Sequence, residues 1–367
     1  MFRMANRDDL QQKLEALRLK IDQIDRRIVE ALNERAESVV EIGRIKQVDE
    51  APIYAPDREK RVLEQIRGFN RGPMPDAALG AVWREIMSAS FSLERRLSVA
   101  ILGPAGSFSH LTARRKFGAS TDYLPLPSIA AVFNDVAGGR ADMGLVPIEN
   151  SIEGGINETR DSFLDTRVRI CAEVQINIHH NLLSNSAVKD VRRIYSKANG
   201  FNQCRAWLGA HMHEIEQMPV ASTSRAAEMA AAEPGTAAIG SSLAAELYEL
   251  QTLHENIEDD ANNTTRFLVI ARESPPPAGD DKTAVMFTTA HKTGALASVL
   301  DVFRDHKLNL THIDTRPSRR ENWQYYFFVD LLGHEQDETV RRALEEAQGH
   351  CLHLTVLGSF PRAGEVL

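Results

Sequence analysis

Two basic residues stand on a helix face that is otherwise apolar. Arg35 falls on a seam of Leu and Ile residues, and Lys46 follows eleven residues later. A buried arginine is costly unless it is paired, so Arg35 either forms a salt bridge with a nearby glutamate or holds a bound anion. Eleven residues are about three helical turns, which puts Lys46 on the same face with its Cα about 16 Å from that of Arg35. Two side chains of this length could hold a small dianion between them.

A third arginine, Arg18, precedes Arg35 by seventeen residues on the same stretch. A straight helix would separate their Cα atoms by about 26 Å. Arg18 could therefore bind the same small ligand only from a second chain.

The apolar seam predicts a long helix that needs a partner. Its residues recur at spacings of three and four, and they are Leu10, Leu14, Leu17, Ile21, Ile24 and Ile28, then Ile42 and Ile45. A helix over 10–46 would be about 55 Å long, longer than a small domain. Two more helices are predicted over 57–69 and 77–95. This pattern is typical of an intertwined all-α dimer, although a dimerisation stalk without chemistry would share it.

The middle of the chain has a different pattern. Short apolar runs predict strands over 99–102, 143–148, 193–195, 236–239 and 267–270, and helices are predicted between them over 129–137, 201–211 and 224–232. This alternation indicates an α/β fold, long enough for two lobes with a cleft between them. A polar cluster from Asn262 to Thr265, followed by Arg266, runs into the last strand. On its own it is typical of a turn that opens a strand.

The last part follows a proline-rich linker over 275–279 and reads β-α-β-β-α-β, which is ferredoxin-like. Strands are predicted over 284–289, 309–316, 324–331 and 352–360, and helices over 294–306 and 337–348. We therefore predict three domains, over 1–96, 97–275 and 282–363.

The composition excludes several classes of function. Of 367 residues, 43 are Lys or Arg and 51 are Asp or Glu, so the net charge is −8 and no nucleic-acid partner is expected. No apolar run in the sequence approaches the length of about 18 residues that a membrane-spanning helix needs, so no membrane partner is expected. Its three cysteines form no CxxC pair, so no metal site is predicted. We expect a cytoplasmic protein.

Several motifs of the helical segment occur together: Leu17-Arg18, 22–25, Glu34-Arg35, 42–46, Pro52, Arg58-Glu59 and 86–90. They resemble the all-helical chorismate mutase domain. The resemblance implies an intertwined dimer that rearranges chorismate to prephenate, without nucleophile, metal or cofactor. It also implies that Arg35 and the partner chain's Arg18 hold the two carboxylates and that Lys46 meets the ether oxygen. The pocket would be lined by Arg58, Glu59 (at the substrate hydroxyl) and Ser90.

Two positions depart from the family pattern. Ala55 stands where an aspartate often contacts the hydroxyl, and Glu94 stands where a glutamine donates to the ether oxygen. A carboxylate cannot donate a hydrogen bond, whereas a protonated carboxyl can. We therefore expect the pocket to keep Glu94 protonated.

The middle segment carries a second set of motifs in order: 103–110, 146–151, 222–224 and 263–267. The set is similar to the prephenate dehydratase domain, which implies two lobes like those of periplasmic binding proteins and conversion of prephenate to phenylpyruvate. Thr265 would assist the departing hydroxyl, and Arg266 would bind a substrate carboxylate or pair with an acidic neighbour. Further cleft residues implied by the resemblance are Ser107, Glu149, Asn150, Ser151, Thr223, Ser196 and Gln203. The motif that carries Ser196 and Gln203 departs from the family pattern at 197–199.

The third segment carries Gly294-Ala295-Leu296 and Asp314-Thr315-Arg316-Pro317. These resemble the two phenylalanine-binding motifs of the ACT regulatory domain, with Asp314-Thr315 in place of the usual Glu-Ser. The resemblance implies L-phenylalanine as effector and side-by-side pairing into a homodimer or homotetramer.

Together the three resemblances identify a bifunctional chorismate mutase–prephenate dehydratase family with a C-terminal ACT domain. Two alternatives are a dehydratase that prefers arogenate and a non-catalytic amino-acid sensor with a helical dimerisation segment. We expect no cofactor.

Overall fold

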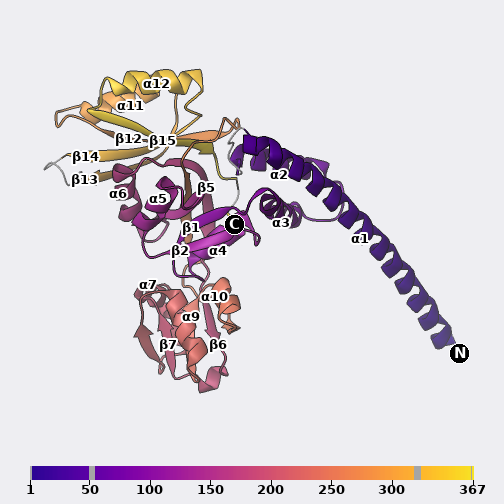
Figure 1. The fold of residues 1–367 in the computed structure, drawn as a ribbon. Helices are drawn as coiled ribbons and strands as arrows, with labels where there is room; N and C mark the ends of the chain where they lie inside the picture. Colours follow the sequence, from indigo (N-terminus) through magenta and orange to yellow (C-terminus); the bar gives the residue numbers. More distant parts are fainter. Residues whose placement is uncertain (1, 49–53, 318–323, 365) are drawn as a thin grey trace.

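The computed structural model describes residues 2–48, 54–317, 324–364 and 366–367. Its helical segment contains α1 (Phe2–Val48), α2 (Pro56–Phe69) and α3 (Asp76–Glu94). The helices predicted over 10–46, 57–69 and 77–95 are confirmed. Figure 1 shows the N-terminal half of α1 projecting far from the rest of the chain. The seam residues Leu10, Leu17 and Ile24 are 55%, 59% and 42% exposed there.

Aromatic packing joins the helical segment to the α/β part of the chain that follows it. The Tyr54 ring lies edge-on to Phe91 of α3 and to Phe117, with centroids 6.1 and 5.3 Å apart. Gly118 follows Phe117 with φ +78°, and a Cβ there would lie 2.5 Å from the Ser88 Cβ. A side chain at this position would thus force the two parts of the chain apart.

The first lobe contains a six-stranded sheet. Its order is β2-β1-β3-β11-β5, with the short β4 added to β3. The strands are β1 (Ser98–Leu102), β2 (Asp122–Leu126), β3 (Met143–Asn150), β4 (Gly154–Gly155), β5 (Arg169–Asn177) and β11 (Thr264–Ala271), and the helices are α4 (Phe108–Phe117), α5 (Ile129–Ala137) and α6 (Asn157–Asp165). Because β11 is antiparallel to both neighbours, the chain returns from the second lobe through the middle of this sheet.

The second lobe contains a five-stranded sheet of order β10-β6-β9-β7-β8. Its strands are β6 (Asn181–Ser184), β7 (Arg193–Ser196), β8 (Glu216–Pro219), β9 (Thr236–Gly240) and β10 (Gln251–His254), and its helices are α7 (Ala198–Gln203), α8 (Arg205–His211), α9 (Thr223–Ala232) and α10 (Ser242–Leu247), with a short 3-10 turn over Val188–Asp190. The single helix predicted over 201–211 is wrong, because the chain leaves helical geometry at Cys204 and two short helices form instead.

The C-terminal unit has the predicted β-α-β-β-α-β order. It consists of β12 (Asp281–Thr288), α11 (Ala295–Asp305), β13 (Leu310–Pro317), β14 (Tyr325–Leu332), α12 (Glu338–Gln348) and β15 (His353–Pro361), and its sheet order is β13-β14-β12-β15. Helices α11 and α12 cover one face (Figure 1).

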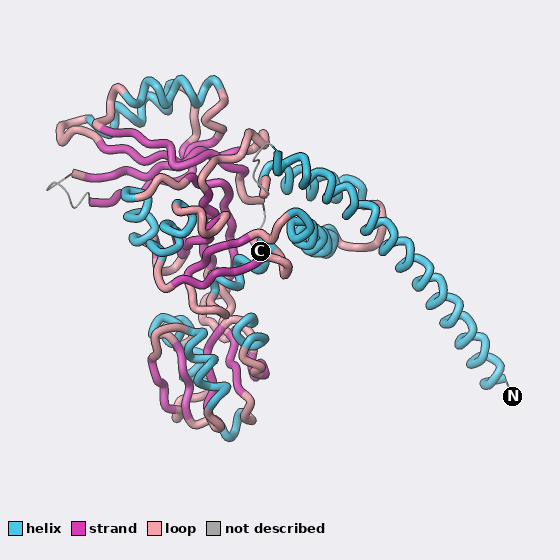
Figure 2. Tube along the Cα trace, viewed as in Figure 1, coloured by secondary structure: helices cyan, strands magenta, loops and turns pink. Residues whose placement is uncertain are grey.

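The other face of this sheet packs on the first lobe, as Figure 2 shows from the stacked strands. Met286, Phe328 and Phe360 join one buried cluster with Val146 and Leu268 of the lobe. At Gly358 (φ +155°), a Cβ would lie 2.2 Å from the Ile170 carbonyl oxygen, so the two sheets approach closely. The ferredoxin-like unit and the first lobe therefore share a hydrophobic core.

Candidate active sites

Arg35 of α1 makes a polar contact with α3. Its Nη1 donates a 2.5 Å hydrogen bond to Ser90 Oγ, which donates in turn to the Ile86 carbonyl at 2.7 Å. Burial, reinforced by the positive charge of Arg58, lowers the pKa of Arg35. This half-buried guanidinium donates to a neutral hydroxyl, and a second arginine lies nearby. This arrangement favours an anion at Arg35 over the salt bridge that the sequence left open.

Lys46 and Glu94 meet at the same helix pair. Lys46 Nζ lies 3.5 Å from Glu94 Oε2, and the Glu94 side chain is 10% exposed. Gly43 permits this approach, because a Cβ there would lie 2.8 Å from Glu94 Cγ. The structure thus pairs Arg35 with Ser90 and Lys46 with Glu94 across α1 and α3, and the protonation of Glu94 stays a prediction.

Arg18 does not belong to this group within one chain. It lies on the exposed half of α1, about 26 Å from Arg35 along a continuous helix. Its expected role from a partner chain remains a prediction.

Glu59 is engaged away from the Arg35 group. Its Oε2 accepts hydrogen bonds from the Tyr54 hydroxyl at 2.6 Å and from Lys116 Nζ of α4 at 2.7 Å. The neighbouring Arg58 is exposed. The expected contact of Glu59 with a substrate hydroxyl therefore requires this carboxylate to exchange partners.

Asn150 and Thr265 form the centre of the second site. They are register partners on β3 and β11, and Asn150 Nδ2 donates to Thr265 Oγ1 at 2.8 Å. The direction of this bond is fixed, because Asn150 Oδ1 accepts from the backbone N–H groups of Ile152 and Glu153 at 3.0 and 2.9 Å. Since Thr265 accepts from Asn150, its own hydroxyl hydrogen remains available to donate elsewhere.

A polar network connects this pair to the second lobe. Asn150 Nδ2 also donates to Asn263 Oδ1 at 2.7 Å, and Asn263 Nδ2 donates to Gln203 Oε1 of α7 at 3.1 Å. Gln203 Nε2 donates to Glu153 Oε1 at 3.0 Å. Glu153, Gln203 and Asn263 line a hollow between the lobes, together with Asn199. The site is therefore built from both lobes.

Three other expected cleft residues have local bonding roles. Ser151 Oγ donates to the Asn262 carbonyl and accepts from the Thr264 N–H, which fixes the turn before β11. Ser107 caps α4 by accepting from the His110 N–H at 3.2 Å. Ser196 is fully buried beneath α7, and its Oγ donates to the Ile239 carbonyl at 3.4 Å. Ser196 therefore shapes the second lobe from within.

The N-terminus of α9 carries Thr223, with Ser222 as its cap. Beside it, Ser224 Oγ is buried, has no hydrogen-bond partner among the residues that the structure describes, and lies near Gly106 of the first lobe. The lobes also meet where Ser241 Oγ donates to the Gly106 carbonyl at 2.8 Å. Thr223 thus lies next to the junction of the lobes, and its role as a cleft donor stays a prediction.

Glu149 and Arg266 lie on the opposite face of the β3–β11 pair. Arg266 pairs with two acidic neighbours, Glu173 and Asp330, which favours the second of the two roles that the sequence left open. Glu149 Oε2 lies 3.7 Å from His312 Nδ1 of β13. The structure therefore does not join either residue to the Asn150–Thr265 pair.

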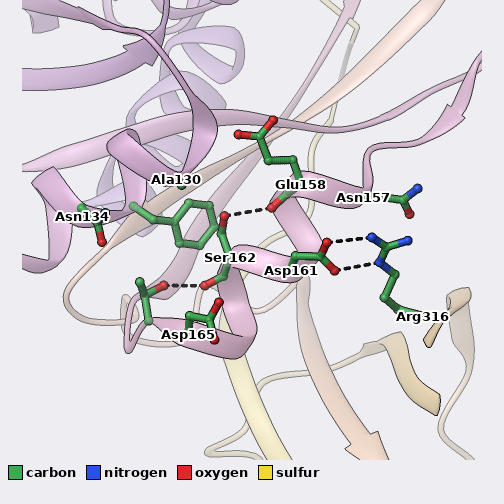
Figure 3. Close-up of a pocket in the computed structure, with 10 residues that line it drawn as sticks. Ala130, Asn134, Asn157, Glu158, Asp161, Ser162, Asp165 and Arg316 are labelled. Carbon is green, nitrogen blue, oxygen red and sulfur yellow. Dashed lines mark hydrogen bonds and ion pairs between the residues drawn. The ribbon is translucent and has the colours of Figure 1, made fainter. Parts of the chain in front are cut away.

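The two effector motifs occupy the ferredoxin-like unit. Gly294 caps α11 with φ +81°, a conformation that favours glycine, and Ala295 and Leu296 open the helix. On β13, Arg316 forms two 2.7 Å bonds with Asp161 of α6, beside a hollow that Asn157, Glu158 and Asp161 line (Figure 3). Asp314 pairs with the buried Arg160 of α6 at 2.5 Å, whereas Thr315 and Pro317 are exposed.

Sequence reasoning missed some of these participants. Asn263 lies within a recognised motif, but only the strand register shows that its amide links Asn150 to Gln203. Glu153 lies two residues beyond the 146–151 motif, and nothing in the sequence around it indicates a cleft residue. His110 belongs to a motif too, and its Nδ1 accepts from the Gly106 N–H at 3.1 Å.

The fold and sites define a class of protein: a helical anion-binding segment fused to a two-lobed α/β catalytic unit and a ferredoxin-like unit. Family models match in the same order, chorismate mutase type II over 17–95, prephenate dehydratase over 99–275 and ACT domain over 283–349. The chain belongs to the bifunctional chorismate mutase/prephenate dehydratase family.

A curated relative of that name from Stutzerimonas stutzeri is 43% identical over 96% of this chain and 98% of its own length. A solved prephenate dehydratase from Arthrobacter aurescens, in complex with L-Phe, is 30% identical with TM-score 0.68, covering 72% of this chain and 90% of that one. A structure described as GqqA, a quorum quenching acylase, is 27% identical with TM-score 0.67, covering 72% and 98%. Because one fold can carry different activities, function must be argued from the sites.

In the parts of the chain that the structure describes, no helix is long and apolar enough to cross a membrane.

Proposed function

We propose that the helical segment rearranges chorismate to prephenate and that the two-lobed unit converts prephenate to phenylpyruvate, with L-phenylalanine as feedback effector of the ACT domain. The observation that carries the dehydratase assignment is the 2.8 Å hydrogen bond from Asn150 to Thr265 beside the hollow between the lobes. Membership of a family named for both activities supports the pairing of the two reactions.

In the mutase reaction, the enzyme's task is to hold a folded dianion and to stabilise charge on the ether oxygen. Arg35, presented by Ser90 at 2.5 Å, binds one carboxylate. The partner chain's Arg18 binds the other. Lys46 donates to the ether oxygen, and a protonated Glu94 donates from the opposite helix, at a position 3.5 Å from Lys46 Nζ. Arg58 and Glu59 complete the pocket, the latter after release from Lys116.

In the dehydratase reaction, the ring carboxylate leaves as CO2. The electron pair of the broken C–C bond enters the ring, which becomes aromatic as the C–O bond to the hydroxyl breaks. The departing hydroxyl takes a proton and leaves as water. Thr265 is suited to hydrogen-bond this hydroxyl because Asn150 occupies its acceptor side. Thr265 is a weak acid, so its contribution depends on its position in a cleft with little solvent.

The proposal includes a dimer or tetramer. The apolar seam of α1 is about half exposed from Leu10 to Ile28, and burial of such a stripe against a second copy would contribute about 25 cal/mol per Å². The same dimer would carry Arg18 to the second chain's Arg35. We also place the enzyme in the cytoplasm, which its free cysteines Cys171, Cys204 and Cys351 support.

The two active sites can be tested by measuring prephenate formation from chorismate and, in a separate assay, phenylpyruvate formation from added prephenate, each with and without L-phenylalanine. Arg35→Ala should abolish the first conversion and spare the second, and Thr265→Ala should do the reverse. If either folded variant loses both activities, the division of labour is wrong. Turnover of arogenate beside prephenate tests the substrate preference, and absence of both activities in the wild-type chain would support the sensor alternative.

A further inference from the structure

The catalytic strand pair presents two chemically different faces. Thr265 and Asn150 are register partners that face the cleft network, and the next register pair is Arg266 and Glu149. Because successive side chains of a strand point to opposite faces, Arg266 and Glu149 point to the ferredoxin-like sheet. The ladder is irregular directly after Arg266, where the register shifts before Phe267. Each cleft residue is therefore one peptide away from a residue that contacts the ACT domain.

Arg266 forms a buried ionic cluster with the ACT domain. Its Nη2 lies 2.6 Å from Asp330 Oδ2, and its Nε donates to Glu173 Oε2 at 2.9 Å. The side chains of Arg266, Asp330 and Glu173 are 12%, 10% and 0% exposed. Burial alone would raise the pKa of Glu173, but the positive charges of Arg266 and Lys282 outweigh it and lower that pKa. Glu173 is therefore ionised, and the cluster joins the two sheets.

The cluster is next to the strand of the second effector motif. Asp330 of β14 is the register partner of His312 of β13, two residues before Asp314. The inward residues of β13 each meet the first lobe: His312 faces Glu149 at 3.7 Å, and Asp314 pairs at 2.5 Å with Arg160, which is 1% exposed. A displacement of β13 and β14 would thus act on the β3–β11 pair directly.

We propose that Arg266 is a positioning residue of the dehydratase, which couples Thr265 to the ACT sheet through Asp330. This inference rests on the proposed function and deepens it. A buried charge pair has few alternative geometries, because separation of the charges in the interior leaves each of them uncompensated. Arg266 therefore fixes the adjacent Thr265 hydroxyl relative to Asn150 only while Asp330 holds its place. Effector binding that moves β14 changes the position of Thr265.

The test is Asp330→Asn in the full-length chain, which keeps the side-chain shape and removes the charge. The matched control is Glu335→Gln, which removes a carboxylate from the 2.6 Å Arg169–Glu335 pair between β5 and the ACT domain. Arg169 is opposite Ala271, at the far end of the β5–β11 ladder from Thr265. Both variants are assayed for dehydratase kcat and KM, for the L-phenylalanine concentration that halves the rate, for mutase activity and for melting temperature.

We expect Asp330→Asn to lower dehydratase kcat about tenfold, to leave the KM for prephenate within about twofold, and to shift the half-inhibitory L-phenylalanine concentration at least about threefold. Mutase activity should stay unchanged, and Glu335→Gln should leave dehydratase kcat and inhibition as in the wild type. The inference is wrong if Asp330→Asn behaves like its control, or if kcat loss simply follows the fall in melting temperature across both variants.

A second variant keeps the test decisive if Asp330→Asn folds poorly. The double variant Arg266→Gln/Asp330→Asn replaces the ion pair by two amides that can still hydrogen-bond. The double variant should fold and should regain part of the dehydratase kcat that Asp330→Asn loses. It should remain less sensitive to L-phenylalanine than the wild type. Full wild-type sensitivity in the double variant would contradict the coupling role. An error in the dehydratase assignment itself would be seen separately, since the wild-type chain would then lack dehydratase activity altogether.

Discussion

Glu59 of α2 and Lys116 of α4 form a salt bridge of 2.7 Å between the mutase segment and the dehydratase lobe. Both side chains are mostly buried, at 10% and 19% exposure, and the same Glu59 oxygen accepts the Tyr54 hydroxyl. Helix α4 begins at the loop that contacts the second lobe through Gly106. The mutase residue expected at the substrate hydroxyl is therefore held by the neighbouring catalytic unit.

Removal of Lys116 should release Glu59 toward chorismate. We expect Lys116→Met to raise mutase kcat/KM roughly threefold, because a freed hydrogen-bonding group is worth about 0.5–1.5 kcal/mol. Steady-state mutase kinetics measure this. Lys60→Met is the control, since Lys60 lies beside Glu59 on α2 but contacts Asp280. A mutase rate that falls in Lys116→Met, with Lys60→Met unchanged, would show that the salt bridge supports the active geometry.

The Asn150–Thr265 bond allows a test of hydrogen-bond direction. Asn150→Asp is nearly isosteric but converts the donor into an acceptor, so Thr265 would donate to it and lose the hydrogen proposed for the leaving hydroxyl. We expect dehydratase kcat to fall about 10²-fold or more, with mutase activity unchanged. Dehydratase kinetics with prephenate measure the effect.

The control for that prediction is Asn177→Asp. Asn177 Oδ1 accepts from Thr264 Oγ1 at 2.8 Å, and an aspartate can accept the same bond. The control should keep most of the dehydratase rate. Equal losses in the two variants would mean that an added negative charge, and not the donor direction, slows the reaction.

The sequence predicts the parts of this protein that depend on local pattern. The seam from Leu10 to Ile45 predicted α1, and the apolar runs at 143–148 and 267–270 predicted the strands that carry the site. It did not show that Arg266 pairs with Asp330, because the two residues are 64 positions apart and the pairing depends on how two sheets stack. It did not show the Glu59–Lys116 pair either, because these residues are 57 positions apart and meet only through the packing of α2 and α4. The apolar pattern also predicted one helix over 201–211, whereas the chain leaves helical geometry at Cys204.

Acid should destabilise the protein through His110. Burial, with the nearby charge of Arg114, lowers the pKa of His110 from 6.5, and its Nδ1 must be unprotonated to accept from the Gly106 N–H. An unfolded chain therefore binds more protons than the folded one below about pH 6.5. The stability that neutral His110 contributes is fully present above that pH and is lost as the pH falls through the lowered folded-state value.

Melting temperature as a function of pH measures this effect. His110→Asn keeps an acceptor for the Gly106 N–H and removes the titration, so its melting temperature should fall less between pH 7 and pH 5. A difference between the wild type and the variant that does not depend on pH would assign His110 a packing role alone.

Glu94 should give the mutase an unusual pH dependence. If its protonated carboxyl donates to the ether oxygen, the mutase rate falls as the pH rises, and Glu94→Gln flattens the profile because an amide donates at every pH. Mutase rates across pH 5–9 measure this in both proteins. Glu94 Oε2 lies 3.5 Å from Lys46 Nζ, so substrate must displace that contact. An identical profile in wild type and variant would remove Glu94 from this role.

Complementation tests whether Arg18 acts across the dimer. In a heterodimer of Arg18→Ala and Arg35→Ala chains, one site receives Arg35 from the first chain and Arg18 from the second, and the other site lacks both. Random pairing of equal amounts makes half of the dimers mixed, so about a quarter of all sites are intact. We expect co-expressed chains to recover about 25% of wild-type mutase activity while each variant alone is nearly inactive. Arg35→Ala paired with Lys46→Ala is the control, because Arg35 and Lys46 lie on the same helix and act in one site. That mixture leaves every site defective and should recover nothing. If the Arg18→Ala and Arg35→Ala mixture also recovers nothing, Arg18 serves its own chain.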